Sequence, residues 1–139
     1  MIHELKTITI LFRAKNYLEE RIKESVEPFG LNVTEFGTLE ALYHKGDLSV
    51  NEILEKVLIA NSSMSYVLQQ LVNKGYITKV QAESDRRSFV VSLTPKGRAL
   101  IKEVYLEHVT HLRESLNVLT PDEESQLQAL LKKIGKQSK

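Results

Sequence analysis

The sequence contains no cysteine in its 139 residues. Without thiols the chain cannot form disulfide bonds, use a thiolate nucleophile or sense oxidants through cysteine. Glycine and proline are few, with six and three residues, and no glycines are arranged as a phosphate-binding loop. No internal repeat, low-complexity segment or interdomain linker is present, so we expect one domain over residues 1–139 with a sizeable hydrophobic core.

Long apolar runs are also missing. The longest run near the N-terminus, Ile8 to Phe12, is interrupted by Thr9 and followed by Arg13. It is too short to cross a bilayer, and no signal-peptide pattern precedes it. We therefore expect a cytoplasmic protein without a membrane partner.

A large excess of one charge is lacking too, because the net charge is only +1. Any binding to phosphates must therefore come from local basic clusters. One cluster lies around a predicted hairpin and consists of Lys79, Arg86, Arg87, Lys96 and Arg98. Such a cluster in isolation is more often a solvated surface than a binding site, but its position in a hairpin favours binding.

Apolar residues recur at helical spacing at both ends of the chain. One stripe runs from Leu5 to Val26, and its width suggests burial on more than one side. Two more helices begin at Thr94-Pro95 and Thr120-Pro121, where a capping hydroxyl precedes a proline at the first helical position. These helices are expected within about residues 1–29 and 100–139.

The central segment, about residues 31–99, contains shorter elements. Thr34 is the predicted N-cap of its first helix. A short strand is expected at Asp47 and Leu48. Ser49 and Glu52 then form a capping box that starts the next helix.

A helix from about Asn61 to Lys74 has two chemically different faces. Its apolar face comprises Ala60, Met64, Val67, Leu68 and Leu71. Its opposite, polar and uncharged face comprises Ser62, Ser63, Tyr66, Gln69 and Asn73, with Ser65 and Gln70 on the flanks. Either Asn61 or Ser62 is expected to cap the helix, and Gly75 to end it in a left-handed conformation.

Two β-rich segments follow and flank a charged loop that holds Asp85, Arg86 and Arg87. This arrangement predicts a β-hairpin. A helix with polar side chains suited to base edges, followed by a hairpin with arginines at its tip, is typical of a winged helix-turn-helix. The predicted fold class is therefore mainly α with a small β-hairpin (α+β).

The order and spacing of these pieces resemble the MarR family of bacterial transcription regulators. The resemblance is carried by Leu71-Val72-Asn73-Lys74-Gly75-Tyr76-Ile77, by Asp85-Arg86-Arg87 and by Leu93-Thr94-Pro95-Lys96-Gly97. The resemblance is close from about Leu31 to Leu100, whereas at the two ends of the chain only the general sequence pattern is similar. It implies a homodimer joined through its N- and C-terminal dimerisation helices, which binds a palindromic operator in double-stranded DNA and acts by default as a repressor.

The predicted DNA-binding residues are Asn61, Ser62, Ser63, Ser65, Tyr66, Gln69, Lys79, Asp85, Arg86 and Arg87. The helix is expected to enter the major groove, where Gln69 is suited to pair with adenine. Many relatives carry arginine where this chain has Tyr66, so a phosphate or a thymine methyl is the expected partner of Tyr66. Its alternative role is packing against the hairpin.

In the family, the second arginine of the Asp-Arg-Arg motif reaches the minor groove and the acid orients it. The corresponding residues here are Arg87 and Asp85, and a narrow minor groove attracts arginine. Arg86 is expected to contact a phosphate or to brace the loop. The alternative for Asp85 and Arg87 is a surface ion pair worth at most about 1 kcal/mol.

The resemblance also implies a small-molecule effector bound between the dimer helices and the DNA-binding segment. Helix order suggests that such a pocket is lined by Phe12, Tyr17, Phe36 and Tyr43, although core packing is the more common role for each of these residues. The downstream wing and the run from Ser63 to Leu68 are most similar to the branch that responds to quinones and phenols. Without cysteine, such an effector would bind directly as a small aromatic molecule.

Other functions have weaker support in the sequence. His108 and His111 are three residues apart on one helix, which can seat a metal ion, but no HExxH pattern accompanies them. No serine lies in a Gly-x-Ser-x-Gly turn, so we expect no enzymatic activity, no cofactor and no metal. The main alternative is a winged helix that binds another protein and has no specific DNA affinity.

Overall fold

The computed structural model describes residues 2–57 and 63–138. Its elements are α1 (Ile2–Val26), the 3-10 turn η1 (Glu27–Phe29), α2 (Val33–Lys45), β1 (Leu48–Ser49), α3 (Val50–Lys56), α4 (Met64–Asn73), β2 (Ile77–Gln81), β3 (Phe89–Leu93), α5 (Pro95–Leu116), α6 (Pro121–Gly135) and the 3-10 turn η2 (Lys136–Ser138). The predicted fold class is confirmed, because a mainly helical chain carries one small antiparallel sheet.

The sheet has three strands in the order β1-β3-β2. β2 and β3 form the predicted hairpin, with Ile77 opposite Leu93 and Gln81 opposite Phe89. β1 adds a third strand by pairing Leu48 with Val91. This strand lies one residue later than Asp47–Leu48, the predicted position, because Ser49 both ends the strand and caps α3.

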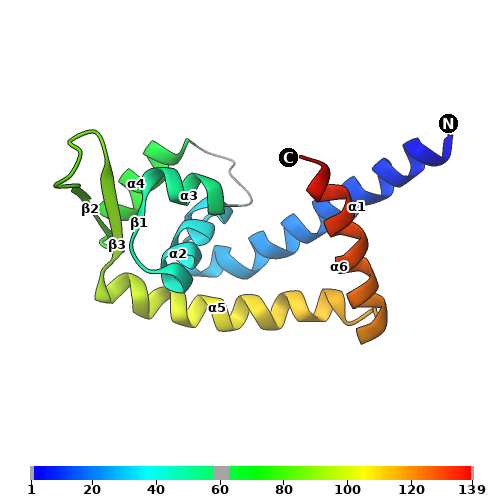
Figure 1. Ribbon diagram of the computed structural model, residues 1–139. Coiled ribbons are helices and arrows are strands. Elements are labelled where there is room, and N and C mark those ends of the chain that lie inside the picture. The colour runs from blue at the N-terminus through cyan, green and yellow to red at the C-terminus, as the bar shows by residue number, and fades with distance from the viewer. Residues whose placement is uncertain (1, 58–62, 139) are drawn as a thin grey trace.

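The molecule has a head and two helical arms (Figure 1). The head consists of α2, α3, α4 and the sheet. One arm is α1, and the other is α5, which leads away from the head, together with α6. α1 lies along α5, and both chain ends lie at the side of the molecule away from the sheet. Arg21 of α1 fastens the two long helices by donating to Ser115 Oγ at 3.0 Å and to Glu114 Oε2 at 3.2 Å.

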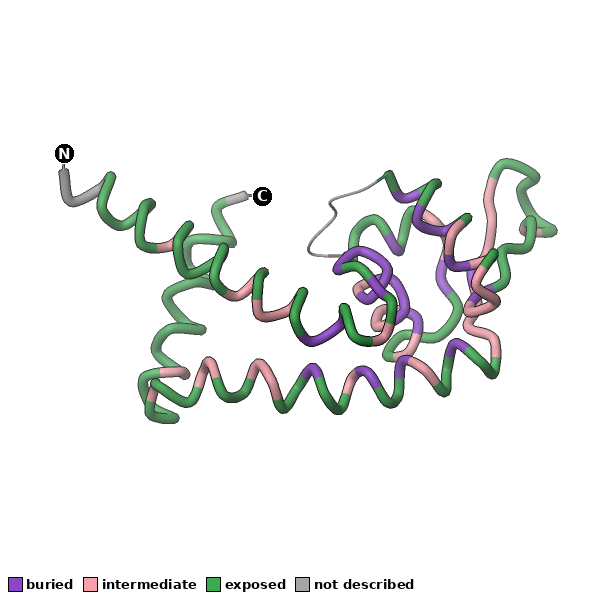
Figure 2. Tube along the Cα trace, turned by 180° about the vertical axis from the view of Figure 1, so that it is seen from behind, coloured by how far each residue is buried: buried purple, intermediate pink, exposed green. Residues whose placement is uncertain are grey.

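The buried residues are concentrated in the head (Figure 2). The largest fully buried side chains include Leu39, Leu42, Ile53, Leu68, Leu71 and Ile101. Packing of α2, α3 and α4 against the sheet and the first half of α5 therefore excludes water from one core. The outer halves of the arms are mostly exposed, although many of their side chains are apolar.

Most of the predicted helix caps are confirmed. Ser49 accepts a hydrogen bond from the Glu52 amide at 3.1 Å, and Thr120 accepts one from the Glu123 amide at 3.2 Å, each within a capping box. The prediction that Thr34 caps α2 is wrong, because the cap is Asn32 and its box partner is Glu35. Asn32-Val-Thr-Glu35 has the box spacing, which frees Thr34 to lie inside the first turn with 1% of its surface exposed.

A tight turn places the hairpin directly after α4. Gly75 follows the helix with a φ of +82°, as predicted for a left-handed position. Thr94, the cap of α5, donates to the Gly75 carbonyl at 2.6 Å and so joins the two ends of the hairpin. A Cβ at Gly97 would lie 2.0 Å from the Tyr76 carbonyl oxygen, so the start of α5 packs directly on the backbone of this turn.

None of the described helices combines the length and the apolar character that a membrane span requires.

Candidate nucleic-acid interface

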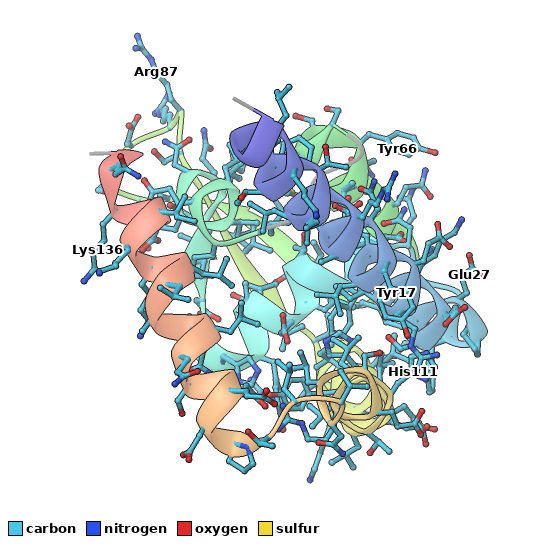
Figure 3. The ribbon with its side chains drawn as sticks, turned by 90° about the vertical axis from the view of Figure 1, so that its right-hand side faces the viewer. Tyr17, Glu27, Tyr66, Arg87, His111 and Lys136 are labelled. Atoms are coloured by element: carbon cyan, nitrogen blue, oxygen red, sulfur yellow. The ribbon has the colours of Figure 1, made fainter. Side chains whose placement is uncertain are left out.

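α4 separates its apolar and polar side chains as its sequence predicts. Met64, Val67, Leu68 and Leu71 are buried in the head. The side chains exposed on the other side are Ser63, Ser65, Tyr66, Gln69 and Asn73. Tyr66 is 61% exposed and projects outward from the helix (Figure 3). Gln69 donates to the Asn73 side chain at 3.0 Å, which aligns two amides along the exposed face.

The start of α4 differs from the prediction. The first helical residue is Met64, and its N-cap is Ser63, whose side chain makes no capping hydrogen bond. The backbone amides of the first turn therefore donate no hydrogen bond to the Ser63 side chain. Asn61 and Ser62, which were predicted as caps and as DNA-binding residues, lie outside the described residues.

Both ends of α4 are fastened to α2. At the start of α4, the Thr38 hydroxyl contacts the Met64 sulfur at 3.7 Å. After its end, the Lys74 ammonium lies 2.8 Å from the carboxylate of Glu35, whose side chain is only 5% exposed. Glu35 also accepts a hydrogen bond from the Asn32 amide, so one carboxylate caps α2 and anchors α4. These contacts fix the direction in which the polar face points.

The loop of the hairpin, the wing, is ordered by Asp85. Its carboxylate accepts a hydrogen bond from the Arg87 backbone amide at 2.9 Å and another from the Ser88 hydroxyl at 3.3 Å. The Gln81 side chain donates to the Arg86 carbonyl and closes the loop from the other side. No ion pair among the described residues joins Asp85 to the guanidinium of Arg87, so the surface ion pair, which was the alternative role of these two residues, does not form here.

Three basic side chains surround the wing, in different ways. Arg86 and Arg87 are exposed, and Arg87 projects beyond the wing tip (Figure 3). Lys79 lies over the ring of Phe89, with 4.6 Å between its ammonium nitrogen and the ring centroid. Since a cation above an aromatic face is attracted to it, this contact holds Lys79 beside the strand.

A hollow of about 260 Å³ separates α4 from the wing. Its lining brings together residues from β1, α3, α4, both strands of the hairpin and the hairpin loop, namely Ser49, Val50, Asn51, Ser65, Lys79, Arg87, Ser88 and Phe89. Ser65, Lys79 and Arg87 were predicted as DNA-binding residues. Ser49 and Asn51 were not predicted to bind DNA, because the sequence indicated only that they lie at the start of a helix.

The four residues predicted to line an effector pocket do not lie around one cavity of the described chain. Phe12 and Tyr17 are exposed on α1, with 58% and 56% of their surfaces accessible. Tyr43 is half-buried beside Tyr105, with 6.4 Å between ring centroids. Phe36 is buried and lines a cavity of about 280 Å³.

This cavity lies where the arms meet the head, and we call it the junction cavity. Its lining comprises Ile22, Val33, Phe36, Gly37, Glu40, Lys56, Val57, His108 and Leu112. These residues belong to α1, α2, the end of α3 and α5. Most of the lining is apolar, which suits a small uncharged ligand.

The two histidines singled out from the sequence have separate environments. His108 is 8% exposed and lies on the Phe36 ring, with 4.4 Å between centroids. His111 is half-buried and lies 3.2 Å from the carboxylate of Glu24. Within residues 2–57 and 63–138, no group of three or more histidine or acidic side chains could hold a metal ion.

Comparisons with known proteins agree with this architecture. The sequence model of the MarR family matches residues 29–88. The chain is 33% identical over 135 residues to the HTH-type transcriptional regulator MhqR of Bacillus subtilis, covering 97% of this chain and 93% of that protein.

Two solved structures share the fold over nearly the whole chain. A putative MarR-like transcription regulator from Bacillus cereus superposes with a TM-score of 0.88 at 23% identity, covering 99% of each chain. BpsR of Bordetella bronchiseptica, whose DNA binding is regulated by 6-hydroxynicotinic acid, superposes with a TM-score of 0.83 at 24% identity, covering 94% of this chain and 98% of that one.

Proposed function

The chain belongs to the MarR family of DNA-binding transcription regulators, and we propose that it represses transcription by binding an inverted repeat as a homodimer. A small aromatic effector that enters the junction cavity would release it from the DNA. The observation that carries the DNA-binding part is the joint exposure of the polar face of α4 and the basic tip of the wing, on either side of one polar hollow.

Adjacent grooves of a DNA duplex are separated by a sugar-phosphate strand. A protein with a helix in the major groove and a hairpin in the neighbouring minor groove must therefore straddle that strand. The hollow between α4 and the wing has the composition that such a strand requires, because Lys79 supplies positive charge and Ser65 and Asn51 supply hydrogen-bond donors. We assign this hollow to the DNA backbone.

The exposed face of α4 is assigned to base edges. The Gln69 amide pairs with adenine, which requires it to exchange its present bond to Asn73 for bonds to the base. Ser63 and Ser65 are short enough to allow close approach, and Asn61 and Ser62 precede them in the same role. Tyr66, exposed and extended, contacts a phosphate or a thymine methyl.

The wing is assigned to the minor groove. Arg87 projects from its tip and supplies the charge that a narrow groove attracts, while Arg86 contacts a phosphate. Asp85 contributes by holding the loop backbone in the shape that projects Arg87. A carboxylate this close to DNA weakens the attraction to phosphates, so its benefit must come from ordering the loop before binding.

Homodimer formation is supported by the apolar residues that the arms leave exposed. These are Leu5, Ile8, Ile10, Phe12 and Tyr17 on α1, Leu106 and Val109 on α5, Val118 in the following turn, and Leu127, Leu130, Leu131 and Ile134 on α6. Exposed apolar side chains gathered on three helices of one surface mark an interaction site. A second copy, related by a twofold axis, would cover it and place two heads on half-sites about 10 bp apart.

An effector response is supported by the position of the junction cavity. Val57 lines it, and this residue directly precedes the connection to α4. A Cβ at Gly37 would lie 3.3 Å from a Val57 methyl, so α2 and α3 already pack tightly there. A ligand between the arms and the head would therefore move α3, and with it the direction of α4.

The decisive experiment for DNA binding is an equilibrium titration of a fluorescent duplex over a range of salt concentrations. The duplex should carry a selected sequence, and a scrambled duplex of equal length serves as the control. We expect the selected duplex to bind more tightly and its affinity to fall steeply with salt, because bound phosphates release counterions. Equal affinity for both duplexes, or no binding, would favour a winged helix that binds another protein.

A further inference from the structure

A chain of hydrogen bonds links α1 to the ring of His108. The Ser25 hydroxyl donates to the Ile22 carbonyl oxygen at 2.7 Å. The same hydroxyl oxygen lies 3.1 Å from Nδ1 of His108. A serine hydroxyl has only one proton, and the carbonyl can only accept it, so Nδ1 must be the donor to Ser25 Oγ. This contact fixes the tautomer of His108, with the proton on Nδ1.

The second ring nitrogen is consequently left with a free lone pair. In the part of the chain that the structure describes, Nε2 of His108 has no hydrogen-bond partner, while the residue itself lines the junction cavity. Burial lowers the pKa of His108 below its ordinary value, and the nearby charge of His111 lowers it further. The ring is therefore uncharged at neutral pH, and Nε2 is a hydrogen-bond acceptor.

The rest of the cavity restricts what such an acceptor can bind. Phe36 supplies an aromatic wall, and Ile22, Val33, Val57 and Leu112 supply aliphatic ones. A volume of about 280 Å³ accommodates a compound with one ring. Two charged residues complete the lining, Glu40 and Lys56, and burial raises the pKa of the Glu40 carboxyl. Glu40 and Lys56 carry opposite charges, so discrimination against an anion rests on Nε2, whose lone pair accepts a hydrogen-bond donor but repels an anionic oxygen.

We propose that His108 determines which effectors the junction cavity accepts, by presenting a fixed hydrogen-bond acceptor that selects small, uncharged aromatic compounds with a hydroxyl donor, of which phenols are the simplest. The proposal rests on the proposed role of the cavity as the effector site. His108 Nε2 accepts the phenolic proton, the ring of the ligand packs beside Phe36, and Ser25 acts as a positioning residue that keeps the tautomer.

The first test is direct ligand binding to the full chain without DNA, followed by NMR. 4-Methylphenol is compared with 4-methylanisole, which has nearly the same shape but no donor, and with 4-methylbenzoate, which is an anion. One hydrogen bond predicts that the phenol binds roughly fivefold more tightly than the anisole. The ¹⁵N signals of the His108 ring should show a protonated Nδ1, and the Nε2 signal should shift on addition of the phenol.

Variants separate the acceptor from the shape of the cavity. His108→Phe keeps a ring beside Phe36 and removes both nitrogens, so the preference for the phenol over the anisole should fall to nearly onefold. Ser25→Ala removes the acceptor that keeps the proton on Nδ1 of His108, so the preference for the phenol should decrease. Thr110→Ala removes an exposed hydroxyl from α5 outside the cavity and should leave this preference unchanged. Thermal midpoints of all three variants are measured to confirm that they fold.

DNA binding by the parent and by His108→Phe is measured alongside without ligand. The proposal is supported if His108→Phe retains its affinity for DNA but loses the preference for the phenol over the anisole. Absence of DNA binding by the parent would contradict the proposed function alone. A proton on Nε2, tighter binding of the benzoate or the anisole, no detectable binding of 4-methylphenol, or unchanged selectivity in His108→Phe would each overturn the assignment of His108.

Discussion

The carboxylate of Asp85 accepts a hydrogen bond from the backbone amide of Arg87, with 2.9 Å between oxygen and nitrogen. A second oxygen of the same carboxylate accepts from Ser88, so the acid holds the backbone of the wing loop. The guanidinium of Arg87 is thereby left exposed and free to contact DNA. The two residues thus cooperate through the main chain, and not through an ion pair.

This geometry predicts different outcomes for two substitutions of Asp85. Asp85→Asn keeps an oxygen acceptor for the Arg87 amide and removes a negative charge, so DNA affinity should be unchanged or higher. Asp85→Ala removes the acceptor, and affinity should fall by about fivefold because the loop must be ordered on binding. Both affinities can be measured by fluorescence anisotropy. If Asp85 acted through the guanidinium charge, both variants would lose affinity.

Arg87 itself is predicted to contribute directly to DNA binding. Arg87→Ala should weaken binding to the selected duplex by about tenfold at physiological salt and reduce the salt dependence, while the thermal midpoint stays nearly constant. Lys102→Ala is a matched control, since it removes one exposed positive charge from α5. Equal affinities of the two variants would show that the wing arginine has no special role.

The stability of the fold should depend on the protonation of His108. Burial and the charge of His111 lower the pKa of its ring below the ordinary value of 6.5. The unfolded chain therefore takes up this proton more readily than the folded chain. The contribution of the uncharged His108 ring to the free energy of unfolding is present in full above the pKa that His108 has in the unfolded chain. It is lost as the pH falls through the pKa of His108 in the folded chain.

Urea unfolding between pH 7.5 and 5.5 checks this dependence. The parent should lose more unfolding free energy on acidification than His108→Phe, in which the titrating ring is absent. His111 and Glu24, which lie 3.2 Å apart, are present in both proteins. Parallel pH curves for the two proteins would show that His108 does not titrate in this way.

The exposed apolar stripe of α6 leads to a prediction about assembly. Leu130 is 58% exposed, so a carboxylate there would be tolerated by a monomer but not at a dimer interface. Leu130→Glu should raise the dimer dissociation constant by about tenfold or more, as seen by sedimentation velocity. Ala129→Glu places the same charge on an adjacent exposed position outside the stripe and should have little effect. If the dimers of both variants dissociated, the added negative charge alone would explain the effect, and Leu130 would have no specific role in the interface.

Local patterns in the sequence were sufficient for most of the fold. The capping boxes at Ser49 and Thr120 and the left-handed position at Gly75 depend on residues a few positions apart, so the sequence shows both partners at once. Asn32 was missed as the cap of α2 although its partner Glu35 has the correct spacing, because the hydroxyl of Thr34 offered another candidate nearby. β1 is too short to have a periodicity of its own.

The candidate sites were less predictable because their contacts are distant in the chain. Ser25 and His108 are 83 positions apart, and nothing local to His108 distinguishes a buried acceptor from a metal ligand. Helix order suggested Phe12 and Tyr17 as pocket residues, but their positions on the outer part of α1 leave them exposed. Asn51 enters the hollow beside the wing only because β1 brings the start of α3 next to β3.

The most direct measurement of DNA recognition is the selection of bound duplexes from a random pool by the purified full chain. Two heads related by a twofold axis predict an enriched inverted repeat whose half-sites have centres about 10 bp apart. Enrichment should disappear at the wing-contacted positions when the selection is repeated with Arg87→Ala. Recovery of no enriched sequence, or of a single half-site without its inverted copy, would contradict recognition by a dimer of winged helices.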